Sequence, residues 1–342
     1  MARSHRGNPA ASIRIHQLYA NPVLMLGLGA LVLSDSEIAM IDQHHKEVLR
    51  NLQRLLPCTP KPVVYFLAGA LPGTAHVHLR QLSNFGMITR MPRSNILHQH
   101  AKNIFSSITI SPRSWFHRIR DLCLLYQLPH PSHLLKSPPS KDEFKTLVKK
   151  QVINYWEQKM RSDSATLKSL EHFHPHYRSL TSPHPIWATA RSSPTKIVMA
   201  SIQSHLISGR YKTESLCGRW SQNPLGLCKL TETCQTSETI THFLQTCSAL
   251  DKTREKLMNF TQSYVRSHPQ VTAIIEQYCN PKSRLFTQFI IDCSTLPEVI
   301  TTVQLHGKDI LTHLYNITCV WCYSLHRDRL KILGRWRNFT KV

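Results

Sequence analysis

Apolar residues recur at steps of three and four positions along most of this chain, which is the period of one face of an α-helix. Over residues 35–56 the apolar positions on that face are Ile38, Ile41, Val48, Leu52 and Leu55. Ser34 and Glu37 have the spacing of a capping box, and Pro57 cannot continue a helix. We therefore predict a helix over residues 35–56.

The same period predicts further helices between breakers. They cover residues 63–91 with an interruption at Leu71-Pro72-Gly73, 101–126 with a break near Ser111-Pro112, 141–170, 195–208, and several more after residue 251, the last over 308–333. Two proline-rich stretches, 128–140 and 172–194, predict a loop and an irregular connector. The apolar run 23–33 is too short to span a bilayer, which needs about 20 apolar residues, so it predicts a buried helix.

These segments predict a mainly α fold, an irregular multi-helix array that carries a small CCHC module held together by zinc. With only 11 glycines and 20 prolines in 342 residues, a β-sandwich is disfavoured. We expect four regions: a helical region at 1–127, a helical connector at 128–208, a metal-binding module at 209–254 and a basic helical region at 255–342. Ten irregularly spaced cysteines favour a reducing compartment, cytoplasm or nucleus, over secretion.

The motif behind the expected module is Cys228-x5-Cys234-x7-His242-x4-Cys247. Three thiolates and one imidazole form the closed tetrahedral set of a structural zinc site, with no position left open for catalysis. The first pair, however, is separated by more residues than the usual two to four. Spacing alone therefore leaves two interpretations open, a Zn²⁺ site or three core thiols beside a helix histidine.

Charge adds a second line of inference. Lys and Arg number 42 against 20 Asp and Glu, a net charge of +22, which favours RNA or DNA as a partner, with membranes second. Cations lie near the motif and near the C-terminus, where Trp336 could stack on a base. The candidate nucleic-acid contacts are Arg210, Lys212, Arg219, Lys229, Arg327, Arg329, Lys331, Arg335, Trp336 and Arg337. Solvated surface residues are the alternative for each of them.

Other cysteine and histidine groups are weaker candidates. His172, His174 and His176 alternate around Pro175, and packing or solvation is favoured over metal binding. Cys319 and Cys322 are three residues apart in a helical pattern, which favours core packing over a redox or metal pair. Cys217 could substitute as a ligand in the CCHC motif.

Residues around the motif resemble the zinc-binding region downstream of the reverse transcriptase domain in LINE-type, non-LTR retrotransposons. The matching positions there are Gly209 to Thr213, Leu216-Cys217, Trp220, the four ligands, Glu238-Thr239 and Arg254. Other stretches that resemble the same proteins are 22–28, 65–72, Ser114-Trp115-Phe116 with Tyr126, Tyr155-Trp156 and 322–329. The resemblance implies a thumb-like helical region followed by a zinc module that helps to hold RNA or DNA.

The family's polymerase binds two metal ions on adjacent aspartates, and this chain contains no Asp-Asp pair. It also lacks the acidic and histidine motifs of the family's endonuclease. We therefore expect no catalytic residues and no enzyme activity, but zinc-dependent binding of retrotransposon RNA or target DNA. We expect no membrane partner. The alternative is a non-catalytic structural or interaction protein, or a relic reading frame with no retained nucleic-acid function.

Overall fold

The computed structural model describes residues 7–107, 111, 113–190, 193–217 and 223–335. Its secondary structure there is helical, with one isolated antiparallel bridge between Leu227 and Ser237 and no strand. The prediction of a mainly α fold is confirmed. No helix in these ranges has the length and apolar content needed to cross a membrane.

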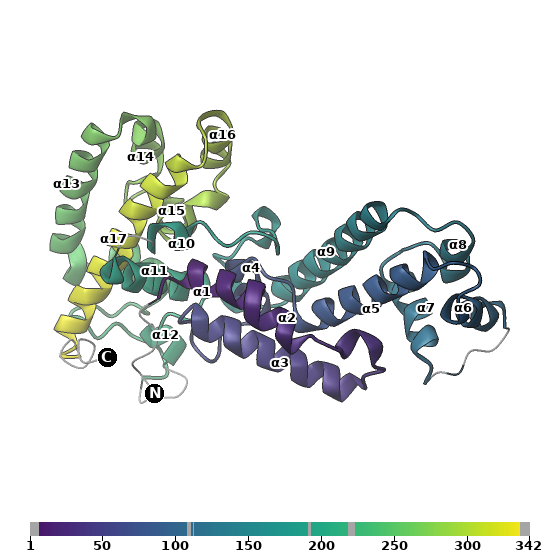
Figure 1. Ribbon diagram of the computed structural model, residues 1–342. Helices are drawn as coiled ribbons and strands as arrows, with labels where there is room; N and C mark the ends of the chain where they lie inside the picture. Colours follow the sequence, from purple (N-terminus) through teal and green to yellow (C-terminus); the bar gives the residue numbers. More distant parts are fainter. Residues whose placement is uncertain (1–6, 108–110, 112, 191–192, 218–222, 336–342) are drawn as a thin grey trace.

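Figure 1 shows an elongated molecule with α6 to α8 at one end and α13 to α17 at the other. The first half contains α1 (Pro9–Ile15), α2 (Asn21–Leu24), α3 (Asp35–Leu52), α4 (Lys61–Ala68), α5 (Gly73–Thr89), α6 (Ile96–Ser106), α7 (Trp115–Leu125), α8 (Pro131–Lys136) and α9 (Lys141–Ala165). The second half contains α10 (Ile186–Thr189), α11 (Pro194–Ile207), α12 (Glu214–Cys217), α13 (Asp251–Ser267), α14 (Thr272–Tyr278), α15 (Phe286–Asp292), α16 (Pro297–His306) and α17 (Asp309–Ile332).

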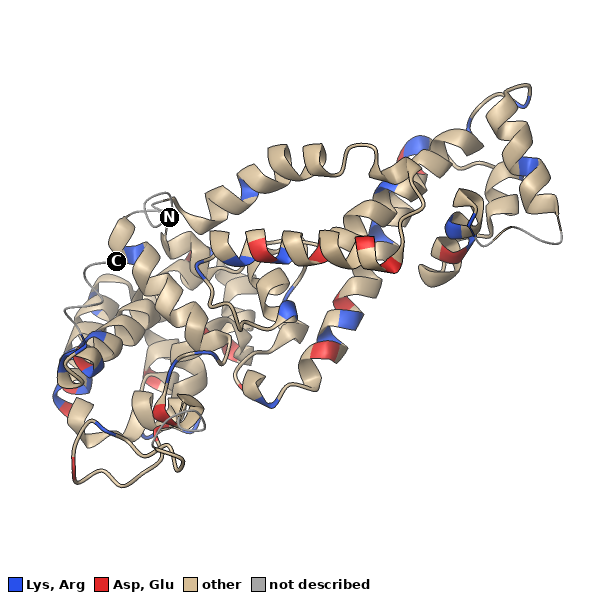
Figure 2. Cartoon of the chain, turned by 90° about the horizontal axis from the view of Figure 1, so that it is seen from below, with Lys and Arg blue, Asp and Glu red and all other residues tan. Residues whose placement is uncertain are grey.

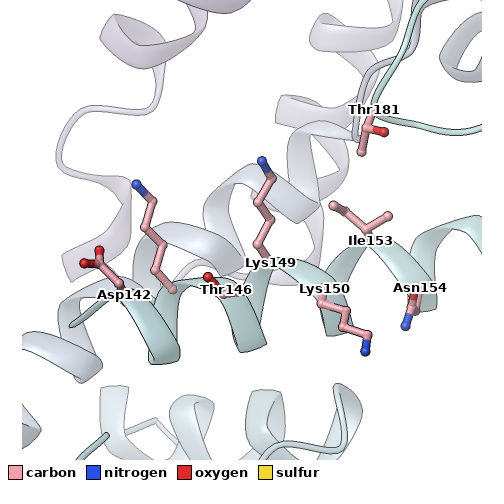
Figure 3. Close-up of a pocket in the computed structure, with 8 residues that line it drawn as sticks. Asp142, Thr146, Lys149, Lys150, Ile153, Asn154 and Thr181 are labelled. Carbon is pink, nitrogen blue, oxygen red and sulfur yellow. The ribbon is translucent and has the colours of Figure 1, made fainter. Parts of the chain in front are cut away.

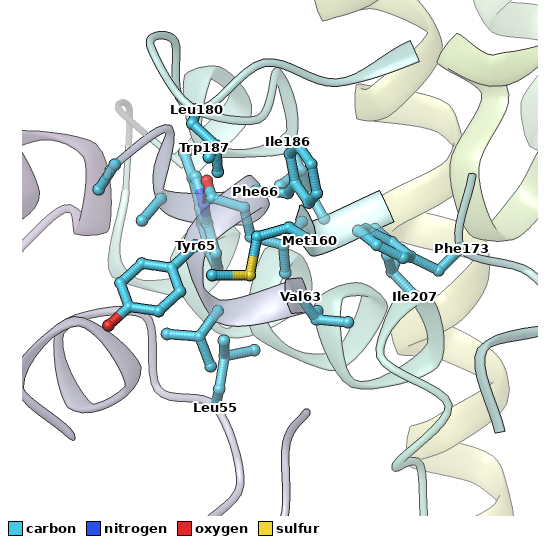
Figure 4. Close-up of a cluster of buried hydrophobic side chains, with 14 of the residues drawn as sticks. Leu55, Val63, Tyr65, Phe66, Met160, Phe173, Leu180, Ile186, Trp187 and Ile207 are labelled. Atoms are coloured by element: carbon cyan, nitrogen blue, oxygen red, sulfur yellow. Dashed lines mark hydrogen bonds between the residues drawn. The ribbon is translucent and has the colours of Figure 1, made fainter. Parts of the chain in front are cut away.

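The centre of the molecule is built around α4. Every side chain from Val63 to Ala68 is fully buried, as expected of a helix that is apolar all round. The indole of Trp187 in α10 donates a 3.0 Å hydrogen bond to the Leu67 carbonyl. Figure 4 shows this cluster, in which side chains of α4, α9, α10 and α11 meet. The core therefore joins segments more than a hundred residues apart.

The second half is organised around α17, which packs against α10, α11, α13, α15 and α16. A buried polar network ties it to the 172–194 stretch. Arg178 donates to Asp292 at 2.6 Å, and the Tyr315 hydroxyl of α17 donates to the same carboxylate at 2.7 Å. Cys319 and Cys322 are buried in the core at α17, where the Cys319 thiol donates to Gln203 Oε1 and the Cys322 thiol to the Ile290 carbonyl, so the preference for core packing is confirmed.

Capping decides several helix ends. The capping box of Ser34 and Glu37 is formed at the start of α3, and Ser140 with Glu143 forms a second one at the start of α9. The helix α3 ends at Leu52, four residues before the predicted end, and α9 ends at Ala165 instead of residue 170. The predicted loop and connector also contain short helices, α8 and α10.

Burial differs from the sequence pattern in two places. The buried residues of α3 are Ile38, Asp42, His45 and Leu49, and Lys61 and Tyr65 of α4 supply polar partners for Asp42. Ile41 and Val48, which belong to the predicted apolar face, are only partly buried. The run 23–33 is not a buried helix, since it forms only α2 and a 3₁₀ turn at Leu28–Ala30. Its most exposed apolar side chains are Val23 at 72% and Leu26 at 75%.

Candidate metal centre

Two local structures bring the predicted ligands together. A turn at Gly226 and the bridge between Leu227 and Ser237 fold the first segment back on itself, and the Cys228 amide donates to the Thr236 carbonyl at 2.9 Å. The second pair is His242, which begins a single π-helical turn (His242–Thr246), and Cys247, which directly follows it. The Cys247 amide donates to the His242 carbonyl at 2.9 Å, so this turn presents both ligands to the same side.

The four ligand atoms lie within 4.8 Å of one another. The Sγ atoms of Cys228 and Cys247 are 3.7 Å apart, and Cys234 Sγ is 3.4 Å from His242 Nε2. Tetrahedral Zn²⁺ with its usual bond lengths requires S···S and S···N edges of about 3.8 and 3.5 Å. Cys228, His242 and Cys247 are buried and Cys234 is half-buried. This cluster could hold a metal ion, and its dimensions fit zinc.

Second contacts orient His242 for that role. Its Nδ1 lies 3.2 Å from Thr246 Oγ1, and its backbone amide donates to Thr239 Oγ1 at 3.1 Å. A hydrogen bond at Nδ1 leaves Nε2 free to bind a metal, which is the usual arrangement at such sites. The sequence signal for this contact is the four-residue step from His242 to Thr246, which places both side chains on one side of a turn.

The surroundings suit a cation with three thiolates. Burial raises the pKa of the Cys228 thiol to about 12 and also raises the pKa of the Cys247 thiol, while it lowers the pKa of His242. Burial alone thus disfavours the thiolates, and the positive charge of a bound dication would stabilise them. Arg254, only 5% exposed, donates to the Cys247 carbonyl and to Asp251. Its charge offsets the net negative charge of a Zn(Cys)₃(His) centre.

Arg329 does not lie where the sequence suggested. It is 4% exposed and forms a bidentate ion pair with buried Glu238, both bonds 2.7 Å long. The Glu238 carboxylate also accepts the Glu214 amide at 2.7 Å. A buried guanidinium held in this way cannot contact phosphate, so the predicted role of Arg329 in nucleic-acid binding is wrong. The pair instead fixes the cluster segment to α17.

Tyr211 makes the second connection to α17. Its ring stacks on Phe243, with centroids 4.9 Å apart, and its hydroxyl lies 2.8 Å from His326 Nδ1. The Arg329 guanidinium lies 5.7 Å from the same ring. For the Glu238–Arg329 pair, the signal in the sequence was an acid beside the metal ligands in a chain with few acids. The partner of Glu238 lies 91 positions away and was not predictable.

The other residues predicted to contact nucleic acid differ in their exposure and in their ion-pair partners. Lys212 and Arg335 are exposed, and Arg210 is half-buried. Lys229 pairs with Glu214 at 2.8 Å, while Arg327 and Lys331 share Asp328. Arg219, Trp336 and Arg337 lie outside the described residues. Figure 2 shows Lys and Arg spread along the molecule instead of gathered in one place.

The weaker metal candidates do not join the cluster. Among the described residues, the only group of His, Cys, Asp or Glu with ligand atoms close enough for a metal consists of Cys228, Cys234, His242 and Cys247. Neither Cys217 nor the 172–176 histidines belong to it. All ten cysteines are free thiols.

Comparisons of the chain with protein-family models, with curated proteins and with solved structures give no significant match.

Proposed function

We propose that this chain is a non-catalytic nucleic-acid-binding protein whose cluster of Cys228, Cys234, His242 and Cys247 binds one structural Zn²⁺. The observation that carries the proposal is the closed Cys₃His cluster in a chain of net charge +22. Zinc holds together the short 226–247 segment, whose Leu230, Phe243 and Leu244 pack into the core, and the cations supply phosphate contacts. The sequence resemblance supports a role like that of the region after the palm in a LINE-type reverse transcriptase.

The zinc part is tested by metal content. Purified protein is expected to carry about one zinc per chain, and Cys228→Ser to carry much less, because the closed site needs all four ligands. Cys58→Ser is the matched control, since Cys58 is an exposed thiol outside the cluster. Less than one zinc per chain, with no difference between the two variants, would remove the metal from the proposal.

The binding part is tested by fluorescence anisotropy with labelled single-stranded RNA and duplex DNA. We expect binding at low salt that weakens linearly on a log-log plot as salt rises, because phosphate contacts release condensed counterions. Absence of binding to both probes at low salt would refute nucleic-acid binding.

The rival function is that of a protein-interaction module. It is favoured by the exposed apolar side chains near the N-terminus, such as Leu18, Val23 and Leu26. Exposed apolar patches of this kind occur at protein contacts. Zinc binding without nucleic-acid binding is the result that would favour this rival.

A further inference from the structure

The helix α9 has two faces of opposite character. One face buries Phe144, Val148, Val152, Trp156 and Met160 and packs against α4 and α5. The exposed side of the helix carries Lys145, Lys149 and Lys150, and Figure 3 shows Lys149 and Lys150 pointing in different directions from it. Lys145 and Lys149 are four residues apart and therefore lie one above the other, about 6 Å apart along the axis. Like charges at this spacing repel each other, and an anion bound beside them would offset that repulsion.

These lysines line a hollow of about 600 Å³. Figure 3 shows Lys149 reaching into the space beside α9, with Thr181 across from it. Thr146 and Asn154 on α9 add a hydroxyl and an amide, and Asp142 is the only acid in the lining. Ile153 is the only apolar side chain there. The hollow thus offers cations and neutral donors, but no aromatic ring on which a base could stack.

The α9 lysines also differ from the cations near the metal centre. Lys229, Arg327 and Lys331 each have a carboxylate partner. Within the described parts of the chain, no carboxylate lies within ion-pair distance of Lys145, Lys149 or Lys150. Unpaired cations gain more from a polyanion, because no existing ion pair has to be broken.

A second hollow in the same half of the chain has the same character. It measures about 550 Å³, lies between α6 and α8, and has Arg93, Lys102 and Lys136 in its lining, with no acid. Lys136 ends α8, and only residues 137–140 separate it from the start of α9. Basic hollows therefore occur in the half of the chain that lacks the metal centre.

We propose that the α9 face of Lys145, Lys149 and Lys150 binds the sugar-phosphate backbone of a nucleic acid strand. This inference rests on the proposed nucleic-acid binding. It assigns the main contact surface to α9 instead of to the cations near the metal centre and the C-terminus that the sequence predicted. Lysines hold the phosphates by charge, while Thr146, Asn154 and Thr181 donate hydrogen bonds to phosphate oxygens. Without a stacking ring or a base-reading contact, the binding is independent of sequence and sensitive to salt.

The test compares two triple variants that each remove three positive charges. Lys145→Gln/Lys149→Gln/Lys150→Gln changes the proposed surface, and Lys252→Gln/Lys256→Gln/Lys282→Gln changes exposed lysines elsewhere. Anisotropy with a labelled oligouridine and with a mixed-sequence DNA duplex measures their dissociation constants. Helix content, melting temperature and zinc content show that both variants remain folded.

The α9 variant is expected to raise the dissociation constant for each probe at least about tenfold and to lower the salt slope by about 2 to 3. The control variant is expected to stay within about twofold of the natural chain. Equal weakening by the two variants, or none by either, would overturn the α9 surface while leaving nucleic-acid binding intact. If the natural chain binds neither probe, the proposed function fails with it. Competition by polyglutamate as strong as by unlabelled oligouridine would overturn the assignment in favour of an acidic peptide.

Discussion

Gly69 is a single residue on which the central packing depends. It ends α4 in the left-handed region, with φ +58°, and a Cβ built there would lie 2.0 Å from the carbonyl carbon of Ser182. Gly69→Ala therefore adds a backbone collision to the cost of a left-handed conformation. We expect it to lower the free energy of unfolding by more than about 2 kcal/mol, measured by urea denaturation.

Gly334 is the matched control for Gly69. Its φ is +67°, but none of the described residues has an atom within 4 Å of a Cβ built at that position. Gly334→Ala carries only the conformational cost, about 1 kcal/mol. Equal losses in the two variants would show that the close approach of residues 182–183 to α4 contributes nothing.

At the scale of elements, the ion pair between Glu238 and Arg329 joins the metal-binding segment to α17. Both groups are almost fully buried, so Arg329→Met leaves an unpaired carboxylate in the interior. We expect a loss of about 3 to 5 kcal/mol in the free energy of unfolding. Arg327→Met, at a partly exposed position on the same helix, is expected to change it by less than about 1 kcal/mol.

A double variant separates pairing from simple truncation. Glu238→Gln with Arg329→Met removes both buried charges, and we expect it to be less destabilising than Arg329→Met alone. Additive losses would mean that the two groups do not interact in solution. Loss of zinc from Arg329→Met at neutral pH would show in addition that α17 holds the cluster in shape.

At the scale of the whole molecule, buried histidines predict acid sensitivity. Burial lowers the pKa of His45 to about 2, that of His78 to about 3, and those of His76, His184 and His326 to about 4. Their ordinary value is 6.5. Below that pH the unfolded chain takes up protons that the folded chain does not. The free energy of unfolding therefore falls as pH drops, by up to about 1.4 kcal/mol per pH unit for each histidine.

Urea denaturation between about pH 8 and pH 5 measures this slope. Above pH 6.5 both states hold these imidazoles neutral, so they cause no change there. His45→Leu is expected to make the slope shallower, and His306→Leu, at an exposed position, to leave it unchanged. A flat profile down to pH 5, or identical slopes for the two variants, would contradict the prediction. Zinc release in acid affects the natural chain and the two histidine variants alike, so it does not account for a difference between their slopes.

Local features of this protein were predictable from its sequence. The capping box at Ser34 is formed by atoms three residues apart, and the long helix predicted over 308–333 is α17 with its ends shifted by one residue. The four metal-ligand candidates also follow from residue type and spacing within twenty positions. Helical period, caps and turn hydrogen bonds act over a few residues, so the local sequence is sufficient to predict these features.

Burial and partner choice were decided by the tertiary structure. Asp42 is buried because Lys61 and Tyr65 of the next helix face it, and Arg329 is withdrawn from solvent by Glu238. The run at residues 23–33 is apolar by composition, yet much of it stays exposed. The sequence of an amphipathic or apolar segment shows which surface would gain from burial. Whether another element buries that surface depends on residues tens of positions away. Those long-range contacts exist only once the chain has folded.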